Sequence, residues 1–136
     1  MTFEELTVGQ SESVEVVVDS GQIDEFAKLS GDYSPIHVDG DRARASGFSD
    51  RVAHGFLIGA YVSRLVGMRI PGAPGVLLSE TLRFHRAVHP GDALVVTGTV
   101  RHLSESMQTV ELDISVTRGA DAVATGTVQV LLKRQP

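Results

Sequence analysis

The sequence predicts an α+β fold, in which an antiparallel β-sheet wraps around one long buried helix. Residues 52–66 are apolar on nearly every side, which is typical of a buried helix. Residues 110–116 alternate apolar and polar side chains, the strongest strand signal in the chain. Strand-like segments follow the helix one after another, an order that favours an antiparallel meander packed on it.

The N-terminal third is predicted to form a strand followed by a helix. Alternating valines mark a short strand over residues 14–18. Asp19 can cap the next helix, with Gln22 as its capping-box partner three residues later. Gly31 is expected to end that helix, since glycine readily adopts the left-handed conformation that ends many helices.

The second half of the chain is predicted to form four strands. Leu82 and Phe84 are expected to face the core from the first of them. The last strand carries small side chains on one face, which would let a helix approach the sheet closely: Ala122, Ala124 and Gly126. The predicted strands cover residues 76–88, 94–100, 110–116 and 122–132.

Composition limits the classes of function. The 136 residues suit one domain, predicted over residues 1–136, with 42% hydrophobic and 21% charged residues. A net charge of −5 without a basic run argues against nucleic-acid binding. The chain has no cysteine and shows no secretory signal, and its longest apolar stretch, which carries Arg64, is too short to span a membrane. We therefore expect a cytoplasmic protein that does not associate with membranes.

A carboxylate and an imidazole lie close together on one short segment. Asp32 and His37 are five residues apart, and Gly31 and Pro35 predict a stiff, sharply turned loop rather than a regular helix through the segment. Such a loop can hold both groups around a substrate for general acid–base chemistry. Because Asp32 follows the negative end of a helix dipole, we expect its pKa to be raised, which favours a base.

The same segment resembles a known family motif. Phe-Ala-Lys-Leu-Ser-Gly-Asp-Tyr-Ser-Pro-Ile-His over residues 26–37, with Ala43 six residues later, is similar to the motif of the MaoC-like (R)-specific enoyl-CoA hydratases. Ala-His-Gly at 53–55 and Val-His-Pro-Gly-Asp at 88–92 resemble the same family. The resemblance implies a hot-dog fold, usually a homodimer in which the two sheets join edge to edge.

The resemblance also implies roles for individual residues. Asp32 and His37 would be the catalytic pair, and the amide of Gly55 would polarise the thioester carbonyl of the substrate. Ser63 would support the site, and Ser34, where the family commonly has asparagine, would hold the loop with its hydroxyl. To these we add His54 as a weaker candidate for substrate binding, because it stands at the start of the buried helix.

The implied reaction is the reversible hydration of trans-2-enoyl thioesters to (R)-3-hydroxyacyl thioesters. It needs a base for water, an acid at C2 and stabilisation of an enolate-like oxygen. No cofactor is expected, apart from the coenzyme A or the carrier-protein phosphopantetheine that belongs to the substrate.

Other functions also fit parts of the pattern. Asp32, His37 and Ser63 could suggest a serine hydrolase, but Ser63 lacks the Gly-x-Ser-x-Gly elbow that exposes such a nucleophile. A hot-dog acyl-thioesterase and a non-catalytic acyl-binding or subunit-pairing module remain alternatives. A metal site of Asp32, His37 and His54 is not expected, because no compact ligand pair is present. Taken alone, Asp32 could simply cap a turn, and His37 could be an ordinary loop histidine.

Overall fold

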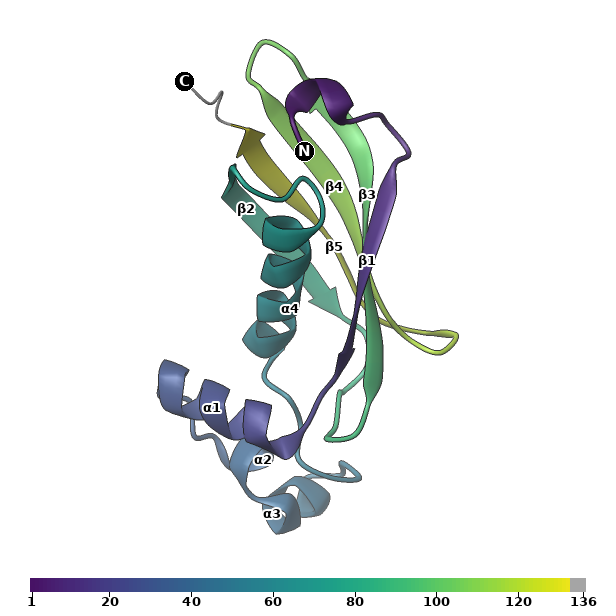
Figure 1. The fold of residues 1–136 in the computed structure, drawn as a ribbon. Helices are drawn as coiled ribbons and strands as arrows, with labels where there is room; N and C mark the ends of the chain where they lie inside the picture. Colours follow the sequence, from purple (N-terminus) through teal and green to yellow (C-terminus); the bar gives the residue numbers. More distant parts are fainter. Residues whose placement is uncertain (133–136) are drawn as a thin grey trace.

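The computed structural model describes residues 1–132, which form one curved sheet around one long helix (Figure 1). The five antiparallel strands lie in the order β1-β3-β4-β5-β2. Helix α4 contacts both edge strands, β1 and β2, as well as β3, so the sheet curls around it. The predicted α+β architecture is confirmed, and residues 133–136 of the predicted domain lie outside the described residues.

The elements follow the chain in simple order. The 3-10 helix η1 and the helices are η1 Phe3–Glu5, α1 Ser20–Ser30, α2 Pro35–Val38, α3 Gly40–Ala45 and α4 Gly55–Met68. The strands are β1 Ser11–Val17, β2 Gly75–Phe84, β3 Ala93–Ser104, β4 Thr109–Arg118 and β5 Asp121–Leu132. Helices α1, α2 and α3 gather at one end of the molecule, beside the start of α4 (Figure 1).

Helix α1 begins and ends where the sequence predicts, but its capping box is only half formed. The carboxylate of Asp19 accepts a hydrogen bond from the Gln22 amide at 2.7 Å, and Gly31 closes the helix at φ 79°. The side-chain oxygen of Gln22 accepts instead from the hydroxyl of Tyr61 on α4, at 2.6 Å. Burial, and then the charge of Asp19, raise the pKa of Tyr61 to about 12, so the hydroxyl stays protonated and donates.

Helix α4 starts later than predicted and is buried on one face only. It begins at Gly55 rather than Val52, because the amides of residues 52 and 53 bond instead to α2 and to the segment before β3. Its outer face is exposed, and Phe56 there keeps 85% of its surface accessible. The buried face consists of Leu57, Ile58, Gly59, Tyr61, Val62, Leu65 and Val66. No helix within residues 1–132 has the length and apolarity needed to cross a bilayer, and the cytoplasmic location stays a prediction.

The sheet confirms the period-two pattern in its centre and departs from it at an edge. All four apolar residues at 110, 112, 114 and 116 are buried. The edge strand β2 ends at Phe84, four residues earlier than predicted, and is largely exposed. Leu82 packs partly against the core, whereas Phe84, on the same face of the strand, does not reach the core and stays 48% exposed. Phe84 lies instead over the start of α4, where its ring contacts Gly55.

Among the small residues of β5, Gly126 packs against strand β2, whereas the sequence predicted that it would pack against a helix. Gly126 is paired with Leu82 of β2, and a β-carbon on Gly126 would collide with the carbonyl of Thr81 in that strand. The glycine therefore allows close approach of a strand backbone rather than of a helix. Ala124 is fully buried, whereas Ala122 is exposed.

We predict that Gly126→Ala destabilises the protein by about 2 to 3 kcal/mol, because the backbone of β2 must move to admit the methyl group. Urea unfolding monitored by circular dichroism measures this change. Gly67→Ala is the matched control, since nothing lies within 4 Å of its added carbon. A Gly126→Ala protein as stable as the parent would contradict the close strand contact.

Candidate active site

The motif segment folds as a turn followed by a single helical turn. Gly31 ends α1, residues 32–34 form the turn, and Pro35 occupies the first position of α2. Proline cannot continue a helix through the segment, as predicted, but it suits a first position where no amide donor is needed. His37 therefore lies on a short helix, whereas the sequence predicted a loop.

His37 has its tautomer fixed by the backbone. Its Nδ1 lies 2.6 Å from the carbonyl oxygen of Val52. A carbonyl only accepts, so Nδ1 carries a proton, and in the neutral ring Nε2 is the nitrogen that holds the lone pair. Nε2 faces Oδ2 of Asp32 at 3.7 Å. That separation is too long for a direct hydrogen bond, but one water at about 2.8 Å from each atom can bridge them.

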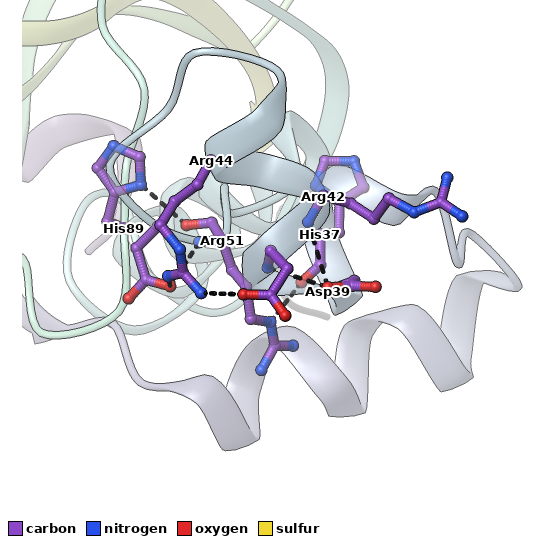
Figure 2. A network of polar contacts seen from close by, with 8 residues as sticks. His37, Asp39, Arg42, Arg44, Arg51 and His89 are labelled. Carbon is purple, nitrogen blue, oxygen red and sulfur yellow. Dashed lines mark hydrogen bonds and ion pairs between the residues drawn. The ribbon is translucent and has the colours of Figure 1, made fainter.

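Arg51 holds the helix that carries His37 (Figure 2). Its Nε donates to the carbonyl oxygen of His37 at 2.6 Å, and its guanidinium pairs with Asp24 of α1. The carbonyl of Arg51 accepts in turn from Nδ1 of His89, at 2.8 Å. Sequence reasoning missed Arg51 and Val52, because an arginine and a valine in a connecting segment carry no motif signal of their own.

Asp32 is held as an anion. Its Oδ1 accepts the Ser34 hydroxyl at 2.6 Å and the Ser34 amide at 3.0 Å. These two bonds, hydroxyl first, hold the pKa of Asp32 below its ordinary value. The expectation of a raised pKa was wrong, because donors in direct contact outweigh the dipole of the preceding helix. The hydroxyl of Ser34, which was expected to hold the loop, thus bonds to the Asp32 carboxylate.

His54 packs against the pair on the side away from the two cavities, and it lines neither of them. The side chain is only 2% exposed, and its ring stacks on that of His37 with centroids 3.8 Å apart and planes at 23°. Its Nε2 lies 2.9 Å from the main-chain carbonyl oxygen of Asp32. His54 therefore touches both members of the pair.

The site brings together the three groups considered as metal ligands. One potential ligand atom each from Asp32, His37 and His54 lies within 4.8 Å of the others. However, the stacked rings keep their lone pairs in nearly parallel planes, whereas a tetrahedral site needs ligands that converge on one point. Two of the four ring nitrogens also bond to backbone carbonyls. The arrangement suits proton transfer better than metal binding.

Gly55 links the pair to two neighbouring cavities. It is the first residue of α4, where backbone N–H groups have no partner within the helix and the helix dipole is positive. A cavity of about 340 Å³ is lined by His37, Gly55 and Phe84, among others. A second, of about 560 Å³, shares Gly55 and Phe84 and extends between α4 and β2.

Ser63 is separate from this cluster. It is exposed on α4, two turns beyond Gly55, and lines neither cavity. Asp32, His37 and Ser63 therefore do not come together, and the supporting role that the resemblance implies for Ser63 stays a prediction.

Comparisons with known proteins agree with this fold. Residues 5–123 match the family model described as a MaoC like domain. An (R)-specific enoyl-CoA hydratase of Rhodospirillum rubrum is 32% identical over 130 residues, covering 96% of this chain and 90% of the relative. A 3-hydroxybutyryl-CoA dehydratase of Methylorubrum extorquens is 31% identical, covering 98% and 85%. The solved structure of an unliganded (R)-hydratase from Pseudomonas aeruginosa superposes with a TM-score of 0.92 at 30% identity, covering 98% and 86%.

The fold is thus a hot-dog fold, as the resemblance implied, with a carboxylate and an imidazole beside the start of its central helix. The chain belongs to the MaoC-like domain family.

We predict that Ser34→Ala raises the pKa of Asp32, because the strongest donor to the carboxylate is removed. Carboxyl-carbon NMR titration of the Asp32 side chain measures the change directly. Ser34→Thr keeps a hydroxyl at the same position and should leave the pKa low. An unchanged titration in Ser34→Ala would show that the Ser34 hydroxyl does not govern this group.

Proposed function

We propose that this protein reversibly adds water to trans-2-enoyl thioesters and forms (R)-3-hydroxyacyl thioesters. The observation that carries the proposal is the place of His37: its Nδ1 is taken by the Val52 carbonyl, and its Nε2 lies 3.7 Å from the Asp32 carboxylate, next to a cavity that Gly55 also lines. Relatives along nearly the whole chain are named as enzymes of this reaction in one direction or the other, which supports a hydro-lyase.

In the proposed mechanism His37 carries the proton, and Asp32 orients the water and stays an anion. A water bridging them donates one hydrogen bond to the Asp32 carboxylate and gives its other proton to Nε2 of His37. Its oxygen forms a bond to C3 of the substrate, and the π electrons move to the thioester oxygen as an enolate. The proton on His37 then returns to C2 on the same face. The lowered pKa keeps Asp32 anionic, which stabilises the transient imidazolium.

Gly55 supplies the third requirement of the reaction. We assign its N–H, at the positive end of α4, to the substrate carbonyl, whose oxygen gains charge as the enolate forms. Its missing side chain leaves room for that oxygen. The coenzyme A or phosphopantetheine arm of the substrate supplies the thioester, and the mechanism uses no further cofactor.

A direct assay tests the function. Purified protein is incubated with trans-2-enoyl-CoAs of short, medium and long chain and with one enoyl carrier-protein substrate, and loss of the conjugated enoyl absorbance is followed. Chiral chromatography of the product should give the (R)-3-hydroxy isomer. Thioester hydrolysis without hydration would favour the thioesterase alternative, and no reaction with any substrate would favour an acyl-binding module.

We also propose a homodimer. Among residues 1–132, strand β2 is an edge strand with one backbone side unpaired, and it exposes three consecutive apolar residues: Val76, Leu77 and Leu78. The exposed ring of Phe56 on the adjacent helix α4 adds to this surface. Pairing of two β2 edges would continue the sheet and cover these side chains.

Light scattering at micromolar concentration is expected to give twice the mass of one chain, 14.5 kDa. Leu78→Lys places a charge within the proposed interface and should shift the protein toward the monomer. A monomeric parent protein would contradict this proposal.

We predict that Asp32→Asn and His37→Gln each lower kcat by a factor of roughly 10² to 10⁴, the usual contribution of a general acid or base, because His37 cannot transfer the proton without the anion that orients its water and stabilises its charged form. Steady-state kinetics on folded protein, checked by circular dichroism, measures the loss. The double variant should lose much less than the product of the two single losses, because groups that act as a unit are not additive. Normal turnover in either folded single variant would exclude that residue from the mechanism.

We predict that Gly55→Ala lowers kcat/KM by a factor of about 10² to 10³, the usual loss when one oxyanion donor is misplaced. The added carbon would lie 3.0 Å from the ring of Phe84, so this half-exposed ring must move at the edge of both cavities. Melting temperature should change little, because alanine favours the helix. Gly67→Ala, at the far end of α4, is the control. A destabilised Gly55→Ala protein with normal kcat/KM would identify Gly55 as a packing glycine only.

A further inference from the structure

His54 is a buried histidine that the proposed mechanism does not use. Its ring is enclosed between His37, stacked at 3.8 Å, and Phe26, tilted at 57° with centroids 4.8 Å apart. At 2% exposure it is more deeply buried than the only other polar side chain classed as buried within residues 1–132, Thr109 at 4%. It is absent from the lining of both cavities, so it offers no surface to a substrate.

The hydrogen bonds of His54 define its protonation. Nε2 faces the main-chain carbonyl oxygen of Asp32 at 2.9 Å, and a carbonyl only accepts, so Nε2 carries a proton. Nδ1 is buried without a hydrogen-bond partner among residues 1–132. The ring is therefore neutral, since a charged ring would leave a buried N–H donor unsatisfied.

A ring held only for its packing would not need a nitrogen here. Phenylalanine would fill similar space without leaving a buried acceptor unpaired, which costs stability. The feature that phenylalanine lacks is the N–H donor to Asp32. This bond crosses 22 residues of sequence and fixes the backbone of the residue whose carboxylate faces His37.

The backbone of His54 makes a second connection. His54 is the N-cap of α4, and its carbonyl accepts from the amides of Leu57 and Ile58. The next residue is Gly55, the proposed amide donor. One residue thus contacts the proposed base with its ring face, the carboxylate loop with its N–H, and the helix that carries the amide donor with its backbone.

We propose that His54 is a positioning residue, which sets the distance between the Asp32 carboxylate and Nε2 of His37 and does not contact substrate. This inference rests on the proposed function, because it assigns to those two groups their chemical roles. It replaces the substrate-binding role that the sequence suggested for His54. The geometry makes the Nε2–H bond, rather than the ring alone, the element that matters.

Three substitutions separate the bond from the ring. In His54→Gln the side-chain amide nitrogen can reach the place of Nε2 and keep the donor to Asp32. In His54→Asn the shorter side chain reaches only the place of Nδ1, and in His54→Phe the ring stays but the donor is lost. We expect the asparagine and phenylalanine variants to lose kcat by a factor of about 10 to 100, as is usual for outer partners of a site. KM should stay within about threefold, since substrate contacts are unchanged, and the glutamine variant should recover most of the lost kcat.

A double variant and a remote control sharpen the test. In an Asp32→Asn background, adding His54→Phe should cost little further activity, because the bond acts through Asp32. His102→Gln replaces an exposed histidine of β3, far along the sheet, and controls for loss of a histidine. A His54→Phe protein with parental kcat, or a glutamine variant as impaired as the phenylalanine variant, would overturn the proposal.

Nitrogen NMR of the imidazole rings gives a readout that does not depend on activity. The parent protein should show His54 protonated at Nε2 and His37 protonated at Nδ1, and His54→Phe should shift the carboxyl resonance of Asp32. Protonation of His54 at Nδ1 instead would overturn the inference. If the parent protein hydrates no enoyl thioester, the proposed function fails, and these spectra still decide whether His54 holds Asp32 and His37 in place.

Discussion

The hydrogen bond between Nδ1 of His37 and the carbonyl of Val52 is the interaction on which the site depends. It fixes the tautomer, and so it decides which nitrogen can accept a proton. Val52 is itself fixed, because its amide donates to Ile36, and Ala53 next to it donates to Val88. The reactive nitrogen is therefore positioned by backbone groups that tie α2 to the start of α4 and to the segment before β3.

The pKa of Asp32, the other member of the pair, is controlled by hydrogen bonds from neighbouring groups. Asp32 follows the C-terminus of α1, where the helix dipole disfavours a negative charge. The dipole acts through partial charges on carbonyls, whereas the Ser34 hydroxyl and amide touch the carboxylate itself. The Ser34 donors therefore outweigh the helix dipole, and the pKa of Asp32 is lowered. The consequence for the proposed mechanism is a division of labour: a permanent anion beside a neutral imidazole that is free to take the proton.

Sequence reasoning succeeded where a feature depends on a few consecutive residues. The caps at Asp19 and Gly31 and the alternating strand at 110–116 follow from local geometry, and the structure confirms them. The motif around Asp32 and His37 also identified the pair that the fold brings together.

The features that were missed depend on neighbours distant in sequence. The partner of Gly126 is a carbonyl of β2, set by strand register, and the exposure of Phe84 follows from its place on an edge strand. The stacking of His54 on His37 joins segments 17 residues apart that no periodic pattern relates. Likewise, the role of Arg51 depends on how α1 and α2 pack around it. Such contacts are properties of the folded chain, and only the structure shows them.

The exposed apolar surface and the chemistry of the site have a common explanation. Enolate formation is favoured where water is excluded, since fixed donors act more strongly there than in bulk solvent. In one chain, however, the cavity that Gly55 and Phe84 share lies beside the outer face of α4, where Phe56 is 85% exposed. Ser63 lies on that same outer face. The proposed homodimer would cover this face together with β2, and would bring Ser63 out of solvent. The incomplete enclosure of the site and the unpaired edge of the sheet are then two aspects of one surface, and the same association would resolve both.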